Sequence, residues 1–243
     1  MQNRYAGDLG DYAKCGLLRA LCKNDLHLGM VWYLTDDESH NNDGRHRPPL
    51  ELRACDPTMF DAFGIIGDRR SVRQLQMIDA WPKRRTFFDA LLSFQSIKPT
   101  DRADHRSRWV QKAVDASRPC DVVCIDPDNG LEIDSVSRTA KLGPKYAFID
   151  ELQPYWQRGQ SLVIYQHTHR RGSAAEQAAG RVEQLSRAFG RKALLRAVRF
   201  RRGTSRLFLI AMQPGHRGQL SGRLDAMLGG PWAGSFENCS PGR

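Results

Sequence analysis

The chain has 243 residues, of which 40% are hydrophobic, and its 37 lysines and arginines against 27 aspartates and glutamates give a formal net charge of +10. This length excludes a short module held together by disulfides and allows one substantial core, so we expect a single domain. No segment is apolar over the roughly 18 residues needed to cross a bilayer, and the residues after Met1 lack the apolar stretch of a signal peptide. We therefore expect a cytoplasmic protein without a membrane partner.

The excess of positive charge has two interpretations. It forms a solvated surface, or it attracts a polyanion such as nucleic acid through lysine and arginine contacts to phosphates. The composition leaves both open. The six cysteines contain no Cys-x-x-Cys pair and no spacing typical of a zinc site, so we expect reduced structural thiols and no metal.

The first predicted element is a helix over 11–22, because apolar residues recur there at helical spacing. A continuous β-prone run over 30–35 predicts a buried strand that stops at two aspartates. The polar stretch 38–49 contains turn residues and is expected to be an exposed loop. A weaker strand candidate follows over 50–55.

The rest of the chain alternates helices with strands. We expect helices over 71–80, 107–116, 145–157 and 173–189, strands over 121–125 and 161–165, an ambiguous segment over 87–94, and a hairpin of 194–200 with 207–212. This alternation predicts an α/β fold with a mostly parallel sheet covered on both faces, ending in an antiparallel hairpin. Residues 1–213 would form this domain, and the Gly- and Pro-containing segment 214–243 would form a tail.

Polar residues follow several predicted strands at the point where each strand ends. Ligands of open α/β sheets bind beyond the carboxyl ends of the strands, so these residues are the candidates for chemistry. They are Asp36 and Asp37, Asp56, the segment Asp126-Pro127-Asp128-Asn129-Gly130, and His167. Asn129-Gly130 supplies the positive φ of a tight loop that would hold Asp126 still.

The N-terminal segment contributes one more candidate. It is polar and contains Gly7 and Gly10, which let the backbone pass close to a ligand, and Lys14 lies one turn into the first helix. A frayed terminus is the alternative interpretation.

These residues resemble a known family. Ala6-Gly7-Asp8-Leu9-Gly10-Asp11-Tyr12-Ala13-Lys14 resembles the Ala-Gly-Asn-x-Ala-Asp-x-x-Lys segment of the large-subunit ribosomal RNA adenine-N6 methyltransferases. Asn42-Asp43-Gly44-Arg45 stands where that family has Gly-x-Gly-Arg, and Asp126-Pro127-Asp128-Asn129 stands where it has Asp-Pro-Pro-Tyr. The closing hairpin is similar to the one that ends a class I S-adenosylmethionine-dependent methyltransferase.

The resemblance implies a Rossmann-like, methyltransferase-type sheet and an enzyme that methylates the amino group of a nucleic-acid base. Asp126 would accept a hydrogen bond from that amino group, with Asp128, Asn129 and His167 beside it in the catalytic loop and strand end. The residues that it would place around S-adenosylmethionine are Lys14, Asp36, Asp37, Gly44 and Asp56.

The sequence departs from the family at the catalytic motif. Asp128 replaces the second proline and Asn129 replaces the aromatic residue, so this motif has no side chain that stacks on a flipped base. A first alternative takes Asp126, Asp128 and Glu132, facing Asp36 and Asp37, as carboxylate ligands of Mg²⁺ in a nuclease or phosphoesterase.

A second alternative is a module without catalysis that binds nucleic acid. Its basic footprint would lie on the closing hairpin and on the loop after the strand expected over 161–165. The binding residues would be Arg170, Arg171, Arg199, Arg201 and Arg202.

Overall fold

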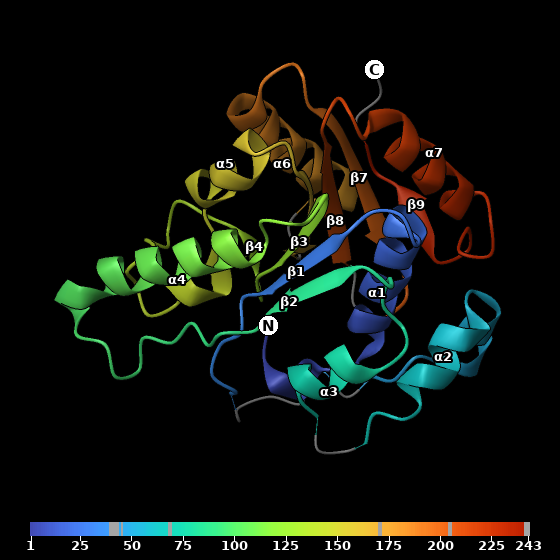
Figure 1. Ribbon diagram of the computed structural model, residues 1–243, viewed down its shortest axis with the longest axis horizontal. Coiled ribbons are helices and arrows are strands. Elements are labelled where there is room, and N and C mark those ends of the chain that lie inside the picture. The colour runs from blue at the N-terminus through green and yellow to red at the C-terminus, as the bar shows by residue number, and fades with distance from the viewer. Residues whose placement is uncertain (39–43, 45, 68–69, 170–171, 204–205, 241–243) are drawn as a thin grey trace.

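A computed structural model gives the fold and describes every residue except 39–43, 45, 68–69, 170–171, 204–205 and 241–243. It is an α/β structure whose central sheet has seven strands within the described residues, in the order β2-β1-β3-β6-β8-β7-β9 (Figure 1). The four strands β2, β1, β3 and β6 are parallel, whereas β8, β7 and β9 pair in antiparallel fashion. The expected α/β class, with a mostly parallel sheet and a closing antiparallel hairpin, is confirmed.

The strands of this sheet have the following bounds: β1 Leu28–Trp32, β2 Arg85–Phe88, β3 Val122–Asp126, β6 Ser161–His167, β7 Leu194–Phe200, β8 Arg206–Met212 and β9 Phe236–Asn238. A separate parallel pair is formed by β4 Gly130–Leu131 and β5 Tyr146–Ala147. The α-helices are α1 Leu9–Cys22, α2 Pro57–Phe63, α3 Val72–Met77, α4 Arg102–Ala116, α5 Ile149–Gln157, α6 Ala174–Phe189 and α7 Arg217–Leu228.

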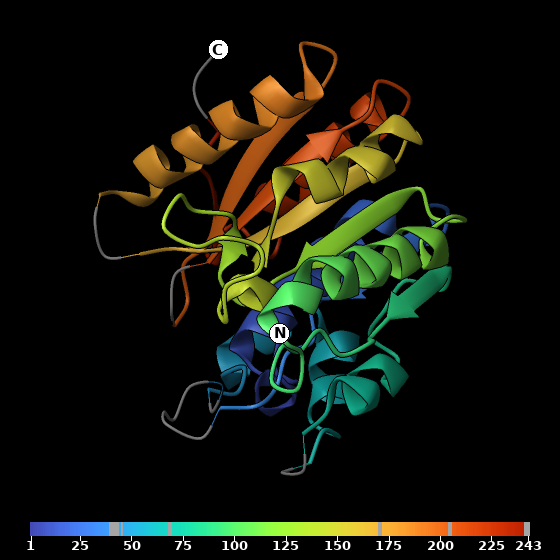
Figure 2. The same ribbon diagram turned by 90° about the vertical axis from the view of Figure 1, so that its left-hand side faces the viewer.

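The helices cover both faces of the sheet because alternate strand residues point to opposite sides. Along β1, Leu28, Met30 and Trp32 join a core cluster with residues of α1, α2, α3 and α7. Val31 and Tyr33 join the opposite cluster with α4, α5 and α6. Figure 2 shows α4, α5 and α6 side by side over their face, in green, yellow and orange.

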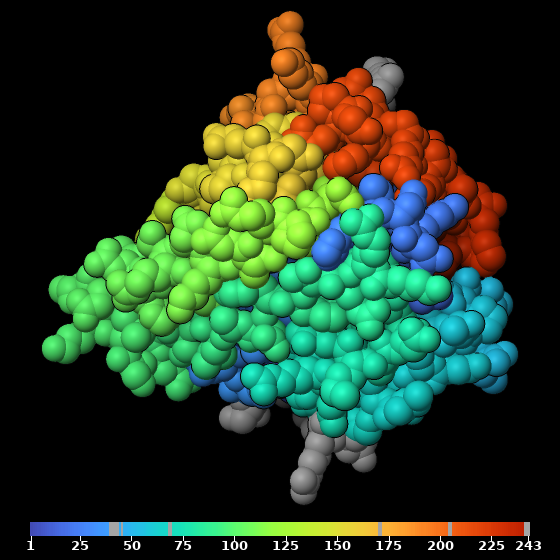
Figure 3. Space-filling model, in the orientation of Figure 1, coloured from blue at the N-terminus to red at the C-terminus, as the bar shows by residue number. Residues whose placement is uncertain are grey.

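Helix α1 is almost completely buried, which is unusual for a helix that begins nine residues into the chain. Asp8 caps it by accepting from the amide of Asp11, and α7 packs against it from the other end of the chain. In Figure 3 only small areas of the blue N-terminal residues reach the surface that faces the viewer. The N-terminal segment is therefore part of the core, and the interpretation of a frayed terminus is wrong.

Three other expectations need correction. The segment 50–55 is the 3-10 helix η2 (Leu50–Ala54) and not a strand, since it follows Pro48-Pro49 and buries only Leu52. The segment 145–157 is not one helix, because the short strand β5 precedes α5, and Pro154 lies inside α5. The residues after Pro214 are not a detached tail, since α7 buries Leu220 and Leu224 and β9 pairs with β7.

Candidate active site

A cavity of about 630 Å³ lies at the carboxyl ends of β1, β3 and β6. The order in which strands are added to the sheet reverses here, because β2 lies on one side of β1 and β3 on the other. Such a switch point is where α/β sheets bind ligands. The cavity brings together six of the residues expected from the sequence, Lys14, Gly44, Asp126, Asp128, Asn129 and His167. The N-terminal segment and the end of β3 thus meet at this cavity.

Lys14 connects α1 to the end of β3. Its Nζ lies 2.8 Å from Oδ1 of Asp11 and 2.7 Å from Oδ1 of Asp126, and it faces the ring of Trp32 at 4.9 Å from the centroid. All three charged side chains are buried and all three line the cavity. One cation is therefore shared between two carboxylates at the wall of the cavity.

Burial and charge act against each other in this cluster. Burial raises the pKa of Asp126 and of Asp11, and the single ammonium group of Lys14 only partly offsets this. For Lys14, burial by itself would lower the pKa, but the two carboxylates outweigh it and hold the pKa above its ordinary value. Lys14 is consequently held in its charged form between two carboxylates whose own pKa values are raised.

Asp128, two residues beyond Asp126, has a different environment. Its Oδ1 lies 2.5 Å from the ammonium group of Met1, and its Oδ2 accepts a hydrogen bond of 2.8 Å from Gln2. Burial would raise the pKa of Asp128, but the ammonium group and the Gln2 amide outweigh it and lower the pKa. Two carboxylates of one short loop are thus shifted in opposite directions, and Asp128 is the one held ionised.

Asn129 and His167 lie at the ends of adjoining segments of the cavity wall. The backbone amide of Asn129 donates to the carbonyl of Lys145 at 2.9 Å, which ties the loop to the start of β5. His167 is the last residue of β6, has an exposed side chain, and pairs in register with Arg206 of β8. Both residues can therefore meet a molecule in the cavity.

None of the three aspartates expected beside the cofactor, Asp36, Asp37 and Asp56, is among the residues that line the cavity. The carboxylate of Asp36 accepts a hydrogen bond from the hydroxyl of Ser93, and Oδ1 of Asp37 accepts from the backbone amide of Arg4 at 3.3 Å. Asp56 caps α2 and pairs with Arg19 at 2.8 Å. The segment before Asp56 is the 3-10 helix η2, so the expectation that Asp56 lies at the end of a strand is wrong.

Gly44 is the described residue of the loop 42–45 and lines the cavity with a φ of +84°. A Cβ at this position would overlap the ring of Tyr5, so a glycine is required for the loop to approach the N-terminal segment. Asn42, Asp43 and Arg45 lie outside the described residues.

Two of the three arginines of the basic footprint that the structure describes pair with one acid. Arg199 and Arg201 contact Glu237 of β9 at 3.0 and 3.5 Å, and Arg202 is exposed at the tip of the hairpin. Arg170 and Arg171 lie outside the described residues. Because β9 pairs with β7, the Glu237 carboxylate offsets part of the positive charge that was expected to bind a polyanion.

The carboxylates proposed as Mg²⁺ ligands are not assembled. Oε1 of Glu132 accepts from the amide of Ile149 at 3.1 Å, which keeps it at the start of α5. In the part of the chain that the structure describes, no group of three or more His, Cys, Asp or Glu side chains is placed to hold a metal ion. The Mg²⁺ hypothesis loses its geometric basis there.

Several residues of the cavity wall were not among the predicted catalytic or cofactor-binding residues, among them Asp11, Glu38, Tyr165 and Arg206. The spacing Asp11-x-x-Lys14 is a signal that one helix face carries an ion pair, and Tyr165 precedes His167 at the end of a buried strand. Burial raises the pKa of Tyr165 to about 12, so its hydroxyl is neutral at physiological pH. Glu38 pairs with Lys145 at 2.6 Å, a contact that only the fold could reveal.

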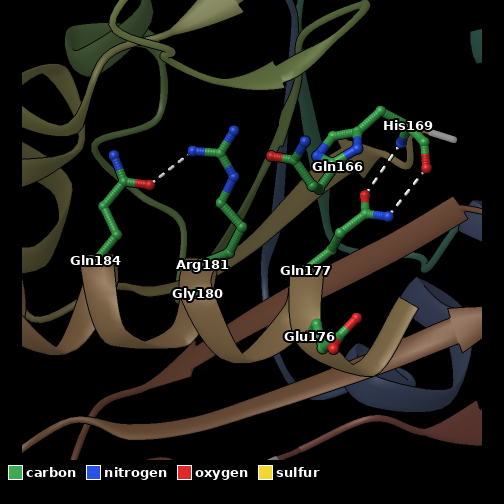
Figure 4. A pocket seen from close by; sticks show the side chains of 7 residues that line it. All are labelled: Gln166, His169, Glu176, Gln177, Gly180, Arg181 and Gln184. Atoms are coloured by element: carbon green, nitrogen blue, oxygen red, sulfur yellow. Dashed lines mark hydrogen bonds between the residues drawn. The ribbon is translucent and has the colours of Figure 1, made fainter. Parts of the chain in front are cut away.

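Two smaller cavities lie along α6, away from Lys14. One of about 270 Å³ is lined by the residues labelled in Figure 4, where Gln177 of α6 forms two hydrogen bonds with the backbone of His169. The other, of about 420 Å³, lies farther along α6 beside Ile149. His169 lines both the cavity of about 270 Å³ and the large cavity, so the segment after β6 lies between these two cavities.

No protein-family model and no curated protein sequence matches this chain. Among the helices that the structure describes, none combines the length and apolar character needed to span a bilayer.

Proposed function

We propose that this protein is a class I, S-adenosylmethionine-dependent methyltransferase-like enzyme that acts on an amino group of a nucleic-acid base. The observation that carries the proposal is the cavity at the switch point between β1 and β3, with Asp126 fixed in its wall by Lys14. The strand order, with β8 antiparallel to β6, is in keeping with the Rossmann-like sheet that the resemblance implies.

The cavity fits S-adenosylmethionine in volume and in charge. Its 630 Å³ lies within the range of about 300 to 1,000 Å³ that is usual for small-ligand sites. Besides Asp126 and Lys14, its wall carries Glu38 and Asp128 as carboxylates for the cofactor's ammonium group, and Lys145 and Arg206 as cations for its carboxylate. Asp56, which the resemblance places around S-adenosylmethionine, is not among them, and Glu38 is the acid on the wall after β1.

S-adenosylmethionine supplies an electrophilic methyl group when bound. The chain's own contribution is alignment. Asp126 accepts a hydrogen bond from the target amino group, Lys14 keeps that carboxylate in place, and Asn129 offers an amide to the same region. A base within structured nucleic acid has to be flipped out of its stack to reach them.

The experiment is methyl transfer from labelled S-adenosylmethionine to pools of ribosomal RNA, transfer RNA and DNA, with Asp126→Asn beside wild type. Asp61→Asn, which alters an exposed ion pair with Arg53, is the matched control and is expected to retain activity. S-adenosylmethionine and S-adenosylhomocysteine are expected to raise the melting temperature of wild type. No transfer to any pool together with no thermal shift overturns the proposal, and hydrolysis that EDTA abolishes would replace it with the metal-dependent alternative.

A further inference from the structure

Gln166 has a buried side-chain amide that does not line the large cavity. It is the residue before the end of β6 and is 5% exposed. Its Oε1 accepts from the backbone amide of Leu131 at 2.9 Å, and its Nε2 donates to the carbonyls of Asn129 at 3.2 Å and His167 at 2.9 Å. One side chain therefore satisfies backbone groups on both sides of Gly130.

Gly130 shows how closely this loop is fitted to Gln166. Its φ is +105°, and a Cβ at this position would overlap the Gln166 amide group. Only glycine combines this backbone conformation with such a close approach. The loop that begins at Asp126 is thus folded over the Gln166 amide.

The far end of the same loop is held from α6. Arg181 donates from Nη1 to the carbonyl of Glu132 at 2.9 Å. Gln166 and Arg181 both line the smaller cavity drawn in Figure 4, at the base of the loop. The segment between Asp126 and Glu132 is therefore fastened to β3 at its start, to Gln166 in its middle and to Arg181 at its end.

We propose that Gln166 is a positioning residue, which sets the place of Asp126, Asp128 and Asn129 in the large cavity through the backbone of Asn129 and Leu131. It touches neither substrate nor cofactor in this scheme. The inference rests on the proposed function, because methyl transfer is the reaction whose alignment the loop controls. Small displacements of aligned groups have large effects on such a step.

The chain provides a matched control at the other end of the same strand. Gln160 immediately precedes β6, is 3% exposed, and donates from Nε2 to the carbonyls of Ser117 and Cys120, each at 2.7 Å. Gln166→Met and Gln160→Met each remove two donated hydrogen bonds from a buried amide of similar size. A general loss of stability is expected in both, whereas only Gln166 faces the catalytic loop.

The first readout is independent of activity. Hydrogen exchange at the Leu131 amide is expected to quicken in Gln166→Met by about tenfold or more, since each 1.4 kcal/mol of lost protection is a factor of ten. Gln160→Met is expected to leave it unchanged. Unchanged exchange at Leu131 in both variants overturns the proposal, whatever the protein catalyses.

The second readout is kinetic. In Gln166→Met, kcat for methyl transfer is expected to fall about 10- to 100-fold, with KM for S-adenosylmethionine within about threefold of wild type. A fall in kcat of equal size in Gln160→Met would mean that both effects come from stability, and would overturn the proposal. If wild type transfers no methyl group but the exchange result holds, the proposed function fails and the anchoring of the loop stands.

Gln166→Glu adds a pH signature that lost packing cannot produce. The ionised carboxylate faces the carbonyls of Asn129 and His167 and can donate to neither, whereas its protonated form can donate to one of them. Activity relative to wild type is therefore expected to recover as pH falls. A ratio that stays flat with pH, or that falls on acidification, contradicts the positioning role.

Discussion

Two buried ion clusters flank the sheet, and they differ in what surrounds them. Arg106 of α4 holds Glu151 of α5 through hydrogen bonds of 2.5 and 2.9 Å, and it also donates to the carbonyls of Gly143 and Tyr146. Glu151 in turn accepts from the amide of Phe148. All the polar groups of this pair are engaged with protein, and neither residue lines any of the three cavities described above.

The Lys14 cluster on the other face has the opposite character. One ammonium group serves two carboxylates, and Lys14, Asp11 and Asp126 all adjoin the large cavity. A buried charge by itself is therefore not a sign of function. The informative combination is a cluster of buried charges next to a space that a ligand can enter.

The largest expected effect is on stability, and it comes from the pair of Arg106 with Glu151. Arg106→Met leaves the Glu151 carboxylate and two backbone carbonyls buried without their donor, so we expect the free energy of unfolding to fall by about 3 to 5 kcal/mol. Urea unfolding followed by circular dichroism measures this change. A loss below about 1 kcal/mol, the range of exposed pairs, would remove the distinction drawn between the clusters.

A smaller loss of stability is expected at the cavity. Lys14→Met leaves two carboxylates without their cation, but water in the cavity can hydrate them, so we expect about 2 to 3 kcal/mol. The same unfolding experiment measures it, with the melting temperature recorded with and without S-adenosylmethionine. Stabilisation by the ligand is expected to disappear in Lys14→Met and to persist in Arg106→Met, and loss in both would contradict the comparison.

Asp126→Asn and Glu151→Gln test which cluster supports chemistry. Asn keeps the size of Asp126 but is a weaker acceptor, so methyl transfer is expected to fall about 100-fold, or about 2.7 kcal/mol in the barrier. Glu151→Gln is expected to reduce stability while the folded fraction retains its rate per molecule. Assays at equal concentrations of folded protein distinguish the two effects, and equal rate losses would argue against a site at Asp126.

The smallest expected effect is the loss of the stability contributed by Asp128 at acidic pH. The pKa of Asp128 is lowered in the folded state, so this group stabilises the protein above its unfolded pKa of about 3.9, and that contribution is lost as pH falls through the lower folded value. The stability difference between wild type and Asp128→Asn is expected to shrink below about pH 4. Unfolding at pH 7 and pH 3 checks the sign, and a difference that grows in acid contradicts the pairing with the Met1 ammonium group.

The sequence by itself determined the buried strands β1, β3 and β6, the hairpin of β7 with β8, and the helix α6 with its Ser173 cap and Gly190 stop. It also identified Asp126, Asp128, Asn129 and His167 as residues of the cavity wall, because residues that follow a buried strand lie at an edge of the sheet. Lys14 was identified from its place in the polar N-terminal segment. These predictions succeed because periodicity, capping and strand ends are local properties of the chain.

Only the tertiary structure decided which of these residues meet. In the folded protein Asp56 forms an ion pair with Arg19, and Asp36 accepts a hydrogen bond from Ser93. Glu38 and Tyr165 line the cavity, and α7 and β9 pack onto the domain. The physical reason is that each of these outcomes joins segments far apart in the chain. Their pairing depends on the packing of the whole sheet and its helices, which no local pattern encodes.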